Sequence, residues 1–258
     1  PMHLSRLDIL QVRNLQNVQI VCHPGANIIF GSNGSGKTSI LEAIYLLGRG
    51  RSFKHRDLRV VVNNDADELV VSARIERVGP ISRLDGKSLQ SAVQLVEELP
   101  LQLIDAHSFT LLEGGPLQRR QFLDWGVFHV EHGYTALWRR FQKALKQRNQ
   151  LLRHGRMDED SLRTWTAELI PLSEQITGFR KQYLADLTKQ VLAVAGRFDG
   201  LGVLELEYYQ GWDDQLSLEQ VLVGDRTRDI ATGKTNHGAH KADIRIKVDG
   251  VAAAERLS

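Results

Sequence analysis

The sequence predicts an α/β fold in which a helical segment is inserted between two parts rich in β-strands. Three observations indicate this. The first hundred residues mix short strand-like runs with one amphipathic helix, residues 116–194 are poor in Gly and rich in Gln, Arg, Leu and Glu, and strand character returns after Gly200. Charged residues at 25% and hydrophobic residues at 42% are typical of a globular protein, which argues against a disordered or fibrous chain.

In the first part, strands are expected over residues 4–12 and 18–22, with a turn following at residues 23–25. Residues 27–30 (Asn-Ile-Ile-Phe) are predicted to form a short buried strand that leads directly into Gly31. Apolar residues then recur at helical spacing from Lys37 to Leu47, and Gly48 and Gly50 are expected to end that helix.

Further strands are expected over residues 69–76, 99–104, 203–208 and 242–248, with hairpin signals at Asp85-Gly86 and Asp249-Gly250. Between them, apolar residues from Leu162 to Val194 recur at steps of three or four, which makes a heptad-like seam.

A shorter seam runs from Trp138 to Leu152, with Arg148 as its polar exception. We expect an antiparallel helical hairpin connected through residues 154–158; the alternative is two ordinary core helices. Pro171 is expected to kink the second helix or to start a new one.

One motif carries chemistry. Residues 31–38 (Gly-Ser-Asn-Gly-Ser-Gly-Lys-Thr) fit the phosphate-binding loop G-x-x-x-x-G-K-[ST], with a predicted strand before it and a helix after it. Glycines let backbone N–H groups approach phosphates, and the N-terminus of the helix favours an anion. Lys37 is predicted to reach the β- and γ-phosphates, and the Thr38 hydroxyl is predicted to bind Mg²⁺. The predicted ligand is therefore a nucleoside triphosphate.

Other candidate sites are weaker. Asp105 ends an apolar run and is a poor candidate for the Mg²⁺ carboxylate, because Gln102 interrupts that run and no glutamate follows. His237 and His240 are three residues apart, but no cysteine or acid lies at ligand spacing, so a metal site is not expected there. Gly115-Pro116 opens a helix whose Arg119 and Arg120 form a second small basic group.

A basic segment follows the predicted helix. Its cations are Arg49, Arg51, Lys54, Arg56 and Arg59, with one acid among eleven residues. These are candidates for binding DNA phosphates, and the alternative is a solvated loop face. With 33 Lys+Arg against 31 Asp+Glu the formal net charge is only +2, so any nucleic-acid surface must be local. Cys22 is the single cysteine, which excludes an intrachain disulfide and favours a cytoplasmic location. No apolar run approaches the length of a membrane span.

Several blocks together resemble the RecF family of bacterial recombination-repair ATPases, which are related to SMC and ABC-type heads. These are residues 31–44, 48–53, 119–130, 145–149 and 237–243. The block Arg-Arg-Gln-Phe-Leu-Asp-Trp at residues 119–125 is highly specific. The resemblance implies an ATPase head with a helical arm, and with ATP and Mg²⁺ as cofactors. It also implies that Gly31, Ser32, Asn33, Gly34, Ser35, Gly36, Lys37, Thr38 and Ser39 hold the nucleotide together with Arg13 and Asn14.

The resemblance further implies an ATP-dependent homodimer on single-stranded, gapped or junction DNA, with RecO and RecR as partners, which promotes RecA loading in recombinational repair and the SOS response. On this basis the expected domains are an N-terminal part of the head (1–115), a helical arm (116–200) and a return to the head (201–258).

Leu257-Ser258 matches only the first two residues of the family's signature. We therefore expect the C-terminal part of the head to be missing, and the chain to bind ATP without the Mg²⁺ carboxylate and catalytic residues that make the intact family a slow DNA-dependent ATPase. The alternatives are a small-molecule phosphotransferase with a helical lid and a purely interactive module.

Overall fold

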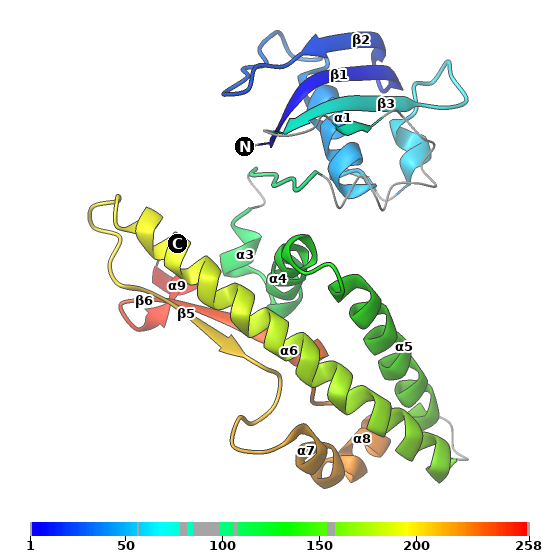
Figure 1. The fold of residues 1–258 in the computed structure, drawn as a ribbon, viewed down its shortest axis with the longest axis vertical. Helices are drawn as coiled ribbons and strands as arrows, with labels where there is room; N and C mark the ends of the chain where they lie inside the picture. The colour runs from blue at the N-terminus through cyan, green and yellow to red at the C-terminus, as the bar shows by residue number, and fades with distance from the viewer. Residues whose placement is uncertain are drawn as a thin grey trace. The chain divides into compact units, whose positions relative to one another are not determined.

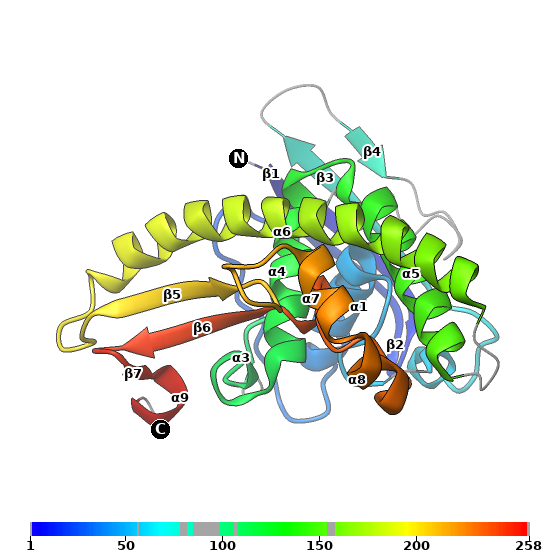
Figure 2. The ribbon, with the colours of Figure 1, turned by 90° about the horizontal axis from the view of Figure 1, so that it is seen from below.

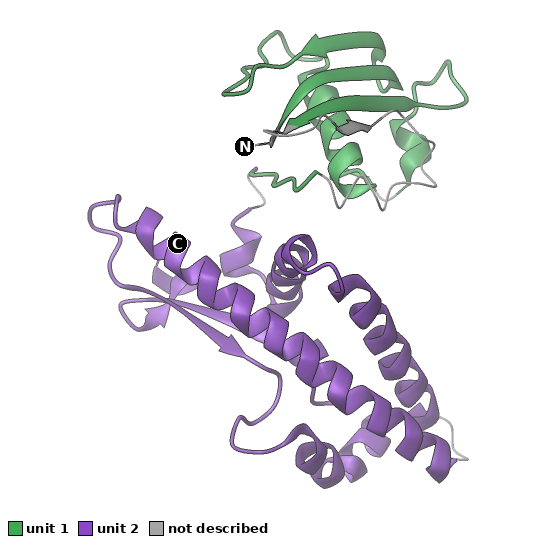
Figure 3. Ribbon diagram, in the orientation of Figure 1, with its two compact units in different colours: residues 1–104 green, residues 105–258 purple. Residues whose placement is uncertain are grey.

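The computed structural model describes residues 2–55, 57–77, 82–84, 99–105, 108–153 and 158–256. The chain divides into two compact units, residues 1–104 and 105–258 (Figure 3). The predicted hairpin at Asp85-Gly86, the connection at residues 154–157, Arg56 and the Leu257-Ser258 dipeptide lie outside the described residues. None of the described helices is long and apolar enough to cross a membrane.

The first unit is an antiparallel sheet covered on one face by a helix (Figure 1). Its elements are β1 (Met2–Val12), β2 (Leu15–Val21), α1 (Lys37–Arg49), the 3-10 helix η1 (Leu58–Val61), β3 (Val70–Arg77) and β4 (Ser82–Leu84).

The strand order is β2-β1-β3-β4, and β1 pairs with both of its neighbours along most of its length. Leu7 and Ile9 point from β1 toward α1, where they form a core with Ala43, Leu46 and Leu47. This core fixes the N-terminal end of α1 beside the β1–β2 turn.

The second unit contains the long helices (Figure 2). Its elements are α3 (Thr110–Glu113), α4 (Pro116–Val130), α5 (Tyr134–Arg153), α6 (Glu159–Ala195), β5 (Leu204–Tyr209), α7 (Leu218–Gly224), α8 (Arg226–Thr232), the 3-10 helix η3 (Ala239–Lys241), β6 (Asp243–Val248), β7 (Val251–Ala252) and α9 (Ala253–Arg256).

The strands form a second antiparallel sheet of order β5-β6-β7. The predicted turn closes β6 against β7, with φ 53° at Asp249 and 78° at Gly250, as a two-residue hairpin requires.

The predicted helical hairpin is confirmed: α5 and α6 lie side by side in both views (Figures 1 and 2). Phe141 and Leu145 from α5 share a core with Leu169, Leu172 and Ile176 from α6. At the other end of α6, Leu184 packs on Leu123 of α4 and Ile244 of β6. Of the two outcomes expected at Pro171, a kink or a new helix, the new helix is wrong, because α6 continues through this residue. Pro171 is exposed, so its ring lies on the solvent side of the helix.

Two predicted strands are wrong. Residues 27–30 and 99–104 have no strand geometry, although the flanking elements form as expected. Ile28 and Phe30 are 85% and 89% exposed, so this segment lacks both a strand neighbour and a covering layer among the described residues. Apolar composition alone does not make a strand, because the ladder needs a partner that supplies hydrogen bonds.

Candidate nucleotide-binding site

The phosphate-binding loop leads into α1 as the sequence predicts. Gly36 caps the helix in the left-handed region at φ 95°, and a Cβ there would collide with Leu15 and crowd Asn14. A side chain is therefore excluded both by conformation and by space. The Lys37 Nζ donates to the carbonyl oxygens of Gly31 at 2.8 Å and Ser32 at 2.7 Å. The lysine side chain thus folds back over its own loop, and its ammonium group lies near the N-terminus of α1.

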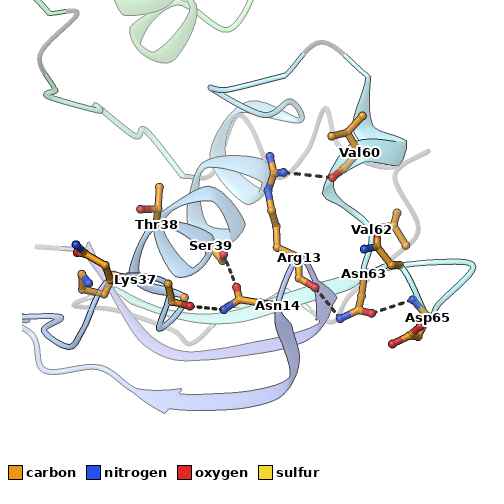
Figure 4. Close-up of a pocket in the computed structure, with 13 residues that line it drawn as sticks. Arg13, Asn14, Lys37, Thr38, Ser39, Val60, Val62, Asn63 and Asp65 are labelled. Carbon is orange, nitrogen blue, oxygen red and sulfur yellow. Dashed lines mark hydrogen bonds between the residues drawn. The ribbon is translucent and has the colours of Figure 1, made fainter.

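The β1–β2 turn braces this loop (Figure 4). Asn14 donates from Nδ2 to the Gly34 carbonyl at 2.9 Å, and its Oδ1 accepts from the Ser39 hydroxyl at 2.9 Å. One side chain therefore joins the middle of the loop to the first turn of α1. Arg13 and Asn14, which the resemblance assigned to nucleotide binding, are placed by the structure beside the loop.

Arg13 occupies a demanding position. As a non-glycine residue at φ 52° it is in the left-handed region, which costs on the order of 1 kcal/mol or more. Its guanidinium forms a two-pronged ion pair with Glu42 of α1, at 2.7 and 3.0 Å, and Ser52 donates a short hydrogen bond to the same carboxylate. The bond to Glu42 raises the pKa of Arg13. Burial would raise the pKa of Glu42, but the bonds from Arg13 and Ser52 outweigh it and lower that pKa.

A third wall comes from the segment after η1, which sequence reasoning missed. Asn63 donates from Nδ2 to the Arg13 carbonyl at 2.6 Å and accepts from the Asp65 backbone N–H at 3.0 Å (Figure 4). Together the three walls enclose a pocket of about 690 Å³. Its lining residues are Arg13, Asn14, Asn33, Gly34, Gly36, Lys37, Thr38, Ser39, Val60, Val62, Asn63, Asn64 and Asp65.

The pocket suits a nucleotide with its cation. Its volume lies in the range of small-molecule sites, and its polar groups converge from three directions. Thr38 is exposed on the wall, so its hydroxyl is open to a hard cation, while Ser39 is buried and serves Asn14. Gly31, Ser32 and Ser35 do not line the pocket, although Gly31 and Ser32 accept the bonds of Lys37.

The cations of the predicted basic segment differ in exposure and in the partners that they contact. Arg51, Lys54 and Arg59 are all exposed, but Arg59 forms an ion pair with Asp57 at 2.9 Å. Arg49 is only partly exposed: its Nη2 donates to the Leu101 carbonyl at 3.3 Å, and burial lowers its pKa to about 10. Arg49, the last residue of α1, is therefore a weaker candidate for binding a ligand than Arg51 or Lys54.

The weaker candidates are accounted for by structure. Asp105 is exposed outside any strand, and its backbone and carboxylate contact Ser108. His237 lies 2.7 Å from Asp225, whereas His240 contacts the Thr235 carbonyl at 2.9 Å, so the two histidines face different partners. Among the described residues, no group of three or more His, Cys, Asp or Glu is placed to hold a metal.

Comparisons with known proteins agree with this geometry. The family described as "RecF/RecN/SMC N terminal domain" matches residues 3–101. The "DNA replication and repair protein RecF" of Stutzerimonas stutzeri (strain A1501) is 45% identical over 272 residues, which cover 100% of this chain and 74% of the relative. The protein of the same name from Chromohalobacter salexigens is 42% identical and 75% covered.

The chain belongs to the RecF family. The relatives that show this membership carry the name "DNA replication and repair protein RecF".

Two solved structures have the same fold as this RecF-family chain. "Structure of the recombination mediator protein RecF-ATPrS in RecFOR pathway" matches with a TM-score of 0.85, 23% identity, and coverage of 100% of this chain and 76% of that one. The corresponding structure of RecF-ATP matches with a TM-score of 0.82 at the same identity, covering 98% and 75%. The resemblance and the fold class predicted from the sequence are confirmed.

Proposed function

We propose that the pocket of the first unit binds ATP with Mg²⁺, and that the chain uses this binding in DNA repair. The observation that carries the proposal is the convergence of the phosphate-binding loop, the Arg13-Asn14 turn and the segment 60–65 on one pocket. Support comes from the RecF relatives and from the solved RecF structure whose description names ATP.

Each wall has a role in this proposal. Lys37 and the backbone of Gly34 to Gly36 would hold the phosphates, and the Thr38 hydroxyl would hold Mg²⁺, which neutralises phosphate charge. Val60 and Val62 supply the apolar surface of the third wall, where a base would lose water. Asp65 is the one carboxylate among the lining residues, and nothing places it beside an attacking water. Binding is therefore better supported than hydrolysis.

Beyond ATP, we propose the finer properties that the family resemblance implies. These are binding of single-stranded, gapped or junction DNA, an ATP-dependent homodimer, cooperation with RecO and RecR, and promotion of RecA loading in the cytoplasm. Arg51, Lys54 and Arg59 are the exposed described candidates for DNA contact in the first unit. The division into a head (1–115 and 201–258) and an arm (116–200) also stays a proposal. A phosphotransferase function finds no support in the family assignment.

The test of the ATP site is a Lys37→Ala variant. Removing the ammonium that faces the phosphates should weaken binding of a fluorescent ATP analogue at least ten-fold, because a charge-assisted contact contributes about 1.5–3 kcal/mol. Lys189→Ala is the control, since it removes an exposed lysine of α6 that does not line the pocket. Unchanged affinity in Lys37→Ala would contradict the site.

A further inference from the structure

All the charged side chains of helix α5 are positive. Between Tyr134 and Arg153 it has six arginines and lysines and no aspartate or glutamate. We define the α5 basic face as Arg139, Lys143, Lys146 and Arg153, all four of which are exposed. The chain as a whole is nearly neutral at +2, so this is a local concentration of charge.

The spacing places these cations along one side of the helix. Steps of four, three and seven residues keep them on the face opposite the buried Phe141, Leu145 and Leu152. With a rise of about 1.5 Å per residue, the face extends roughly 20 Å along α5. Each strand of a duplex carries a phosphate about every 3.4 Å of axis, so the face is long enough to meet several phosphates.

The four cations of this face form no ion pair with other described residues. Of the remaining cations of α5, Arg140 pairs with Glu168 at 2.6 Å and Arg148 is buried against Asp229. Within the described chain, no ion pair engages Arg139, Lys143 or Lys146, and Arg153 donates only from Nε, to the Gly233 carbonyl at 3.2 Å. Lys234, the residue after Gly233, is exposed and adds a further cation near the C-terminal end of the α5 basic face.

The neighbouring helix shows a different pattern. On α6 the exposed Lys189 lies 2.8 Å from Asp186 and the exposed Arg163 lies 3.9 Å from Asp160, each acid one turn away. These exposed cations of α6 are therefore balanced by acids of the same helix, whereas the α5 basic face leaves its charge to solvent. An uncompensated row of cations at regular spacing is complementary to a polyanion with regular spacing.

We propose that the α5 basic face binds the phosphate backbone of DNA. The inference rests on the proposed DNA-repair function, but it assigns a surface in the second unit, separate from the ATP pocket and from the segment 49–59. The contact is to phosphates and carries no base readout, because lysine and arginine on an exposed helix face reach the backbone as flexible charges. It would contribute affinity and salt dependence without sequence preference.

The test compares two triple variants with equal loss of charge. Arg139→Gln/Lys143→Gln/Lys146→Gln neutralises the α5 basic face, and Arg163→Gln/Lys181→Gln/Lys189→Gln removes three exposed cations from α6. Binding of a fluorescein-labelled gapped duplex is measured by anisotropy between 50 and 200 mM NaCl, with ATP present. The slope of log K against log[salt] should become less steep by about 2 to 3 in the α5 variant, with affinity down at least ten-fold at 100 mM. The α6 variant should keep the wild-type slope.

An unchanged slope in the α5 variant would overturn the proposal. This holds even if the variant loses binding to an acidic protein, because the face would then bind a protein and not DNA. Equal losses in both variants would overturn it too, because the effect would then be one of net charge. Thermal unfolding followed by tryptophan fluorescence confirms that both variants are folded. ATP affinity is measured on the same samples and on Lys37→Ala. This separates the two hypotheses, because the ATP site can be confirmed while DNA binding by the α5 basic face is contradicted, or the other way round.

Discussion

At the scale of single residues, the proposed ATP pocket depends on a strained arginine. Arg13 is held in the left-handed region by its ion pair with Glu42, by its own N–H on the Val61 carbonyl at 2.8 Å, and by Asn63 on its carbonyl. Strain of this kind persists only where the surroundings fix it. Because the partners come from α1 and from the third wall, Arg13 ties all three walls together.

Residue types alone predicted part of this pocket. The phosphate-binding loop was visible because its spacing is a chemical requirement, and Arg13 and Asn14 followed from the family resemblance. No sequence motif marks Asn63 and Asp65 as pocket residues. Their segment reaches the pocket only because the fold brings Asn63 to the carbonyl of Arg13, some fifty residues earlier in the chain. The sequence predicts Arg49 as a DNA-binding cation, because its hydrogen bond to the distant Leu101 carbonyl leaves no mark in the sequence.

A second residue-scale feature is the buried pair of Arg148 and Asp229. Their side chains are 2% and 0% exposed and 2.7 Å apart, and Arg148 also donates to Thr235 at 2.7 Å. The polar exception in the seam of α5 is thus a cross-link from α5 to α8, through Asp229, and to the segment after α8, through Thr235.

We predict that Arg148→Met destabilises the second unit by about 3–5 kcal/mol, because it leaves the Asp229 carboxylate buried without its cation. Urea denaturation followed by tryptophan fluorescence measures this. Arg140→Met is the matched control on the same helix: its pair with Glu168 is exposed, so the loss should stay below about 1 kcal/mol. Equal losses would show that the buried pair has no special weight.

At the scale of elements, periodicity predicted helices better than strands. The seams of α5 and α6 were recognised because a helix satisfies its own hydrogen bonds and needs only an apolar face to pack. Residues 27–30 and 99–104 looked like strands by composition, but a strand requires a neighbour that composition does not reveal. In contrast, β1 and β3 alternate and find each other, with Leu7 opposite Ala73 and Ile9 opposite Val71.

Two helical glycines give an element-scale prediction. Gly178 of α6 is exposed, and an added Cβ would meet nothing within 4 Å. Gly178→Ala should therefore stabilise the second unit by about 1 kcal/mol through helix propensity alone. Gly126 of α4 instead packs directly on the Tyr183 ring, with which a Cβ would collide. Gly126→Ala should destabilise despite the same gain in propensity. Thermal melts of both variants measure the pair, and stabilisation by Gly126→Ala would contradict the close packing of α4 on α6.

At the scale of the whole molecule, three of the five blocks that resemble the family lie together in the second unit. Arg119 forms a two-pronged pair with Asp243 at 2.7 and 3.0 Å, and Arg120 donates to the Ala242 carbonyl at 2.7 Å. Asp124 accepts from Arg180 at 2.7 and 3.0 Å. The family blocks at 119–130, 145–149 and 237–243 are therefore mainly cross-links among α4, α5, α6 and β6. Their specificity reflects an arrangement of helices, while the proposed nucleotide site lies in the first unit.

The two units should respond to acid in different pH ranges. Burial lowers the pKa of His240 to about 4, and Lys241 and Arg120 act in the same direction, although the bond to the Thr235 carbonyl opposes it. Since an unfolded histidine titrates near 6.5, the unfolded state binds the extra proton first, and stability falls as the pH drops from about 6.5 toward 4. In the first unit the pKa of Glu42 is lowered, so its contribution is present above the unfolded value of about 4.3 and is lost only below it.

At pH 5 the second unit should therefore lose about 2 kcal/mol relative to pH 7, while the Glu42 pair of the first unit stays intact. All four tryptophans, at positions 125, 138, 165 and 212, lie in the second unit, so urea denaturation followed by their fluorescence reports that unit selectively. His240→Gln, which keeps a donor for the Thr235 carbonyl but cannot take up a proton, should flatten the dependence between pH 7 and 5. If the wild type were equally stable at both pH values, or if His240→Gln kept the full loss, the buried neutral histidine would not be the group that sets the response.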